Sequence, residues 1–156
     1  MWSDDRNMTS PTRETFLETV REAFAFLRQY GFAEVDPPSH RANEPYQVWF
    51  RAERRFVIVK GEGWGTMASV SLEHEDGLEL AEINLVPAEH RPQRNRKRKA
   101  GEPGQLQQVR EAARRLEDHG ADFLAGDLRR FLALARPLSP YKRPIPTSRR
   151  SSEGAE

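Results

Sequence analysis

The stretch YQVWFRAERRFVIV, residues 46–59, decides the fold class. In its first half Tyr46, Val48 and Phe50 alternate with more polar residues, the period-2 pattern of a half-buried strand. Its second half, residues 56–59, is a β-branched and aromatic run suited to a central strand. Since only a short polar connection at 53–54 separates the two halves, they are predicted to form a β-hairpin.

Further strands are expected on both sides of this hairpin. Residues 33–35 fit a short edge strand, and the alternation over 68–73 fits a strand with one apolar side. The dipeptide Asp76-Gly77 predicts a tight hairpin turn after that strand. In 78–86 the apolar residues change parity, so either a bulge interrupts a strand or the chain becomes helical near Ala81; we favour the strand with a bulge.

Apolar residues at helical spacing predict three helices. The first follows Ser10, which can cap it, and Pro11, which fits the first helical position, and it ends at Gly31. The second spans 105–119, and a shorter third begins at Asp127.

This order of elements predicts an α+β fold: an N-terminal helix, an antiparallel β-meander of four to five strands, and two C-terminal helices packed on one sheet face. The other face is expected to be wet. It would carry Trp49, Arg51, Arg55, Ser69, Ser71 and Glu73. We expect one domain over 10–137 with a flexible basic loop at 90–104, and disordered ends at 1–9 and 138–156.

Composition limits the function classes. The 156 residues include no cysteine, which excludes disulfides, thiolate chemistry and Cys-ligated metal sites. The acidic start of the chain does not resemble a secretory signal, and no apolar run reaches the ~18 residues of a membrane span. A cytoplasmic location is therefore expected. The 21 Arg against 4 Lys hint at a GC-rich, bacterial genome.

Charge is divided along the chain. Residues 1–90 carry a net charge of −7 and residues 91–156 a net charge of +8. Such polarity suggests self-association, a charged partner or a solvated surface.

The densest charge is a cationic run between 91 and 99. It contains Arg91, Arg94, Arg96, Lys97, Arg98 and Lys99. Such a run could neutralise nucleic-acid phosphates, although the chain shows no stacking platform or recognition helix. It could equally be a solvated loop, or fold back on the acidic stretch 72–90.

Other patterns fall short of a reactive centre. The glycines of 61–65 lie between two strands rather than before a helix, which predicts a hairpin turn and not a phosphate loop. His74 has acidic neighbours, but consecutive strand residues point to opposite faces. Glu79, Glu82 and Glu89 form no recognisable catalytic pair. We therefore expect no cofactor, no metal and no enzymatic activity.

Three segments carry a resemblance to known proteins. They read FAFLRQYGF at 24–32, LELAEINL at 78–85 and HGADFLAGDLRRF at 119–131. In this arrangement, over about 14–136, the chain resembles a loose group of small bacterial α+β proteins, some of them similar to immunity proteins that neutralise toxins. The resemblance implies protein binding and carries over no functional residue.

The preferred interpretation is a non-enzymatic protein-binding module with an immunity-like or regulatory role in a bacterium. Its contact candidates are Trp49, Trp64, Glu73, Glu75 and Asp76. The alternative is a nucleic-acid-associated protein that binds the phosphate backbone through 91–99 and the Arg-rich tail. A third hypothesis is an enzyme whose site is assembled only in three dimensions.

Overall fold

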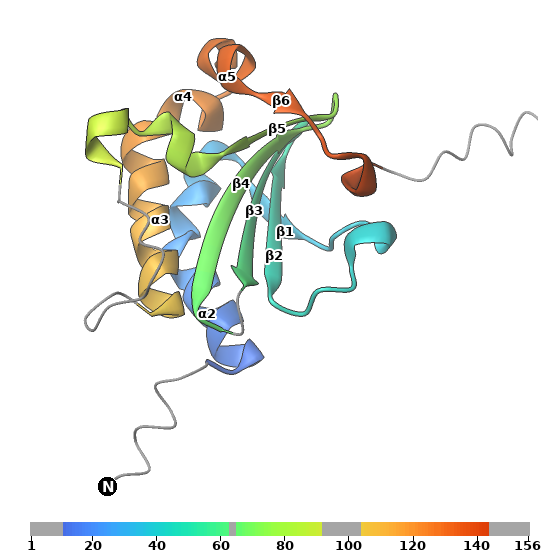
Figure 1. Cartoon of the computed structure of the whole chain (residues 1–156), viewed down its shortest axis with the longest axis vertical. Helices are drawn as coiled ribbons and strands as arrows, with labels where there is room; N and C mark the ends of the chain where they lie inside the picture. Colours follow the sequence, from blue (N-terminus) through green and yellow to red (C-terminus); the bar gives the residue numbers. More distant parts are fainter. Residues whose placement is uncertain (1–10, 63–64, 92–103, 144–156) are drawn as a thin grey trace, which may run out of the picture.

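The computed structural model describes residues 11–62, 65–91 and 104–143. These form one antiparallel sheet with two long helices against one of its faces (Figure 1). The α+β class and the order helix, meander, helices are confirmed.

The sheet is a simple meander in which each strand pairs with the next in sequence. Its strands are β1 Ala33–Val35, β2 Gln47–Ala52, β3 Arg55–Glu62, β4 Met67–His74, β5 Leu78–Ala81 and β6 Arg136–Pro137. Both expected tight turns are present. Glu53 takes a φ of 57° between β2 and β3, and Gly77 takes a φ of 91° between β4 and β5, where glycine meets no Cβ penalty.

The helix layer consists of α2, Arg13–Ala23, and α3, Gln105–His119. The α3 bounds are those predicted. The start of α2 differs from prediction, because its cap is Thr12, whose side chain accepts from the Thr15 amide at 3.1 Å. A 3-10 helix, η1 Ala25–Tyr30, prolongs α2. This helical segment ends at Gly31, which has a φ of 85°, as expected.

The hydrophobic core lies between this layer and the sheet. Its fully buried side chains include Phe16, Val20, Phe24, Leu27, Val57, Val59, Leu72, Val109, Leu116, Phe123, Leu124 and Phe131. Every second residue of the central strands contributes to it, so the alternation over 46–72 determines the face that the helices cover.

The segment after β5 corrects one prediction. The strand ends at Ala81 and a 3-10 helix, η3 Glu82–Leu85, follows, so the favoured strand with a bulge is wrong and the helical alternative is right. The turn buries Leu85 in the core beside α3. A second 3-10 helix, η4 Ala88–His90, leads to Arg91.

Two short helices, α4 Ala121–Leu124 and α5 Arg129–Leu134, close the end of the core. Arg55, expected on the wet face, instead lies buried on the helix side. Its guanidinium donates to the carbonyls of Phe123 and Leu124 at 3.1 and 2.6 Å, which satisfies the last turn of α4.

The second face of the sheet, opposite the helices, is only partly wet: Arg51 and Ser69 are exposed as expected, but other residues of this face are buried. Trp49 and Glu73 are each only 3% exposed there. Two chain segments cover them in place of a helix: residues 39–44, which contain η2 Ser39–Arg41, and residues 138–142, which contain η5 Pro140–Lys142 (Figure 1). We call these two the cover segments.

The packed part of the chain extends beyond Pro137. Leu138 is buried and its amide donates to the Gly77 carbonyl at 2.9 Å, so 138–143 belong to the fold rather than to the expected tail. The predictions for 1–9, for most of the basic loop and for 144–156 fall outside the described residues. Among the residues described, no helix is long and apolar enough to cross a membrane.

Candidate functional site

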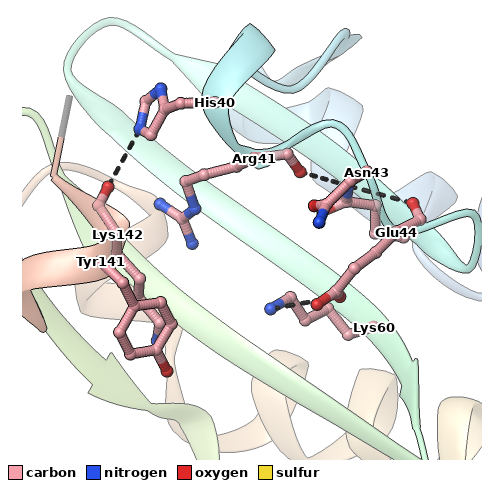
Figure 2. Close-up of a pocket in the computed structure, with 8 residues that line it drawn as sticks. His40, Arg41, Asn43, Glu44, Lys60, Tyr141 and Lys142 are labelled. Carbon is pink, nitrogen blue, oxygen red and sulfur yellow. Dashed lines mark hydrogen bonds and ion pairs between the residues drawn. The ribbon is translucent and has the colours of Figure 1, made fainter. Parts of the chain in front are cut away.

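A pocket of about 150 Å³ opens on the second face, where the two cover segments meet (Figure 2). Residues of both segments and of β2 and β3 line it: His40, Arg41, Asn43, Glu44, Gln47, Lys60, Tyr141 and Lys142. The lining contains three basic side chains, Arg41, Lys60 and Lys142, and one carboxylate, Glu44; the carboxylate partners of Arg41 and Lys142 do not line it.

Arg41 is held in place by a buried carboxylate. Its two terminal nitrogens donate to the two oxygens of Glu73 on β4, each at 2.9 Å. The guanidinium also lies over the Trp49 ring, 4.6 Å from the centroid. This planar, bidentate arrangement suits arginine and would not accommodate lysine equally well.

Lys142 is held in the same way by Glu79. Its ammonium lies 2.7 Å from Oε1 of that buried carboxylate on β5. Glu73 and Glu79 are direct cross-strand partners, so two like charges are buried side by side on the second face. Such a pair is unfavourable unless each carboxylate meets a cation, and each cover segment supplies one.

Hydrogen bonds join the cover segments to each other and to the sheet. His40 Nε2 lies 3.1 Å from the Lys142 carbonyl, and must donate because a carbonyl only accepts. The Gln47 amide donates to the carbonyls of Arg41 and Glu44 at 2.7 and 3.1 Å. In turn the Trp49 indole donates to Gln47 Oε1 at 2.8 Å, which couples the buried tryptophan to the pocket.

The third cation, Lys60, has a weaker partner. Its ammonium lies 3.5 Å from Glu44 Oε1, and that carboxylate side chain is about half exposed. In the close-up the Arg41 guanidinium lies between this pair and the Lys142 segment (Figure 2). The pocket therefore combines two firmly held cations with a third whose partner is readily displaced.

The contact candidates from the sequence do not form one acidic surface. Trp49 and Glu73 are buried, which corrects their assignment as exposed contact residues. Glu75 and Asp76 are exposed at the β4–β5 turn, where Arg51 and Arg54 on and after β2 neutralise them. The ion pairs are Arg51–Glu75, Arg54–Glu75 and Arg54–Asp76.

The remaining candidates are mostly outside the described residues. This holds for Trp64 and for the nucleic-acid candidates Arg94, Arg96, Lys97, Arg98 and Lys99. Arg91 is described; its side chain donates to the carbonyls of Val86 and Asn84 at 2.8 and 3.3 Å.

His74 faces the helix side and is largely buried. Its Nδ1 accepts from the Asp76 amide at 3.1 Å, and the Asp76 carboxylate lies 3.4 Å away. Across residues 11–62, 65–91 and 104–143, no three His, Asp or Glu side chains are grouped to hold a metal ion.

The residues that line the pocket were missed at the level of the sequence. His40, Arg41 and Glu44 lie in a stretch read only as a loop, and Tyr141 and Lys142 in a stretch read as a tail. One signal was present: Glu73 and Glu79 alternate with apolar residues across an Asp-Gly turn, so a hairpin places both on one face. Buried there, they require cations from elsewhere.

Two carboxyl groups outside the pocket have shifted pKa values. Burial raises the pKa of Glu82 on η3, although an Arg115 nitrogen 2.7 Å away opposes the shift. Hydrogen bonds from the side chain and amide of Arg129 lower the pKa of Asp127 to about 2. Both groups lie in the helix layer or at its end.

Comparison of the chain with protein-family models, curated proteins and solved structures gives no match.

Proposed function

We propose that this protein is a non-enzymatic binding module for a protein partner, and that the partner contacts the second face at the cover segments. One observation carries the proposal: the side chain of Tyr141 is held out into solvent beside a concave pocket. This residue is 79% exposed. The next residue is fixed by the Lys142–Glu79 ion pair and by the His40 hydrogen bond.

An exposed aromatic on a fixed backbone is well suited to be a contact hot spot. Tyrosine contributes a large apolar area and a hydroxyl while losing little conformational entropy on binding. The adjacent pocket gives a partner side chain somewhere to insert. Loops on a rigid scaffold are a common location for such surfaces, and both cover segments are loops supported by the sheet.

The charge of this surface indicates the kind of partner. The acidic turn at the end of β4 is paired with Arg51 and Arg54. The pocket cations are paired as well, but Glu73 and Glu79 are buried and do not line the pocket, whereas Arg41 and Lys142 do. We therefore propose a partner with an acidic anchor rather than a basic one. An immunity-like or regulatory role in a bacterium remains our proposal, supported by the resemblance of 24–32, 78–85 and 119–131.

The experiment is comparative capture from the native host. Tagged full-length chain would be expressed as wild type, as Tyr141→Ala and as Leu132→Ala, the last a control that removes an exposed apolar side chain on α5. We expect one partner to be retained by the wild type and the control, and to fall at least about ten-fold with Tyr141→Ala. Equal retention by all three chains would reject this surface.

The nucleic-acid alternative has less geometric support. Its binding candidates at 94–99 and its Arg-rich tail lie outside the described residues, so no described surface supports it. Binding to random DNA at two salt concentrations tests this, because reversing Arg96, Lys97 and Arg98 together should abolish a salt-dependent affinity that arises from the loop.

A further inference from the structure

We infer that the pocket between the cover segments is a binding site for one oxyanion group, a carboxylate or a phosphate, carried by the partner. This inference rests on the proposed function and deepens it by naming the chemistry of the anchor. Three features support it: the donors of the pocket, the exposed Glu44–Lys60 pair and the size of the cavity.

Arg41 and Lys142 supply the donors of the pocket. Arg41 donates two of its five N–H groups to Glu73, and Lys142 donates one of its three to Glu79. Neither carboxylate lines the pocket, so the buried acids fix the cations from behind and leave donors for the cavity. Because the side chains of these cations are already fixed, they lose little conformational entropy when an anion binds. Such preorganised donors increase the affinity for an anion.

Glu44 shows what such an occupant would do. It is the carboxylate that lines the pocket, and it already lies against Lys60 at 3.5 Å. That distance is too long for a good hydrogen bond, and the carboxylate is about half exposed, so the pair is weak. An oxyanion that binds in the pocket would replace Glu44 as the partner of the Lys60 ammonium, and the Glu44 carboxylate would then be hydrated.

The cavity size limits the ligand to a group rather than a whole cofactor. Its volume of about 150 Å³ matches roughly five water molecules. Pockets for drug-sized ligands and cofactors are larger, on the order of 300–1,000 Å³. A carboxylate or a phosphate fits with some hydration, while a nucleotide does not, so the rest of the ligand must lie outside, next to Tyr141.

The test uses the full chain and inorganic phosphate or acetate as probes. The Trp49 indole N–H is an internal reporter in NMR titrations, because it donates to Gln47, which lines the pocket. We expect saturable shifts of this resonance and of the amides of 40–44 and 141–142. Glutamate and phosphoserine, both with blocked termini, distinguish a carboxylate anchor from a phosphorylated one.

Three variants make the test decisive. Glu44→Gln removes the competing carboxylate and should tighten phosphate binding about five-fold. Lys60→Gln should weaken it about five-fold, as expected for unit charges ~4 Å apart at the dielectric constant of bulk water. Glu75→Gln, which removes an exposed carboxylate of the β4–β5 turn, should change nothing. Glu44 lies on the rim, so its variant is expected to fold.

Non-saturating shifts, or equal affinities in all four chains, would mean an adventitious ion only and would overturn the inference. Binding that depends on Arg96, Lys97 and Arg98 but not on Lys60 would overturn it as well. The outcome is separable from that of the capture experiment. If phosphate fails to bind while capture still depends on Tyr141, only the anchor is wrong; if Tyr141→Ala leaves capture unchanged, the proposed function fails whatever phosphate does.

Discussion

Replacing Arg41 by alanine should lower the free energy of unfolding more than a substitution that breaks an exposed ion pair. The side chains of Arg41 and Glu73 are only 10% and 4% exposed, and two hydrogen bonds of 2.9 Å join them. The variant would leave the Glu73 carboxylate buried without its cation and would uncover the Trp49 ring beneath the guanidinium. Both effects act in the same direction.

The magnitude follows from the burial. Removing one partner of a buried ion pair costs about 3–5 kcal/mol, most of it the penalty of the uncompensated charge. For a domain of this size that corresponds to a fall in Tm of roughly 10–15 °C. The double variant Arg41→Met with Glu73→Leu removes both charges, so it should recover to within about 1–2 kcal/mol of the wild type.

The assay is urea unfolding followed by far-ultraviolet circular dichroism. The control is Arg54→Ala, which breaks exposed pairs with Glu75 and Asp76 and should cost less than about 1 kcal/mol. If Arg41→Ala costs no more than this control, or if the double variant is as unstable as the single one, the reasoning about a buried, paired second face is refuted.

Three further predictions concern the helix side. Burial raises the pKa of Glu82 above its ordinary 4.5, so the native state keeps the Glu82 proton to a higher pH than the unfolded chain does. The free energy of unfolding of the wild type, relative to that of Glu82→Gln, should therefore fall as pH rises from about 4.5. Urea unfolding of both proteins at pH 4 and pH 7 measures this difference. NMR titration of the Asp127 carboxyl should give a pKa of about 2, and Arg129→Gln should return it toward its ordinary 3.8; no change would remove the assigned cause. Gly120→Ala should cost about 1–3 kcal/mol because its Cβ would lie 2.9 Å from a backbone oxygen of α3, whereas Gly104→Ala, with open space, should not.

The spacing of apolar residues was sufficient to predict the strands and the second helix that enclose the hydrophobic core. The alternation over 46–72 and the spacing over 105–119 produced the correct strands, turns and second helix, because burial on one side imposes a period on the sequence. The pattern failed at 78–86, where the parity change that suggested a bulge is the start of η3, a turn that buries Leu85.

Pattern could not distinguish a wet polar face from a polar face covered by paired charges. The cations that bury Glu73 and Glu79 come from Arg41 and Lys142, 32 and 63 residues away in sequence. Composition misled in the same way beyond Pro137, since the polar average over the C-terminal stretch hid Leu138 and the η5 contacts. The candidate site depends on these long-range pairs, so it emerged only with the fold.

Hydrogen exchange at the Trp49 indole is the sharpest check on the closed second face. With this ring nearly inaccessible and its N–H bonded to Gln47, we expect exchange slowed by orders of magnitude relative to free indole, as in the protected core amides. An indole proton that exchanged as fast as one in open solvent would mean that the cover segments do not lie on the sheet, and both the pocket and the binding surface built on it would have to be abandoned.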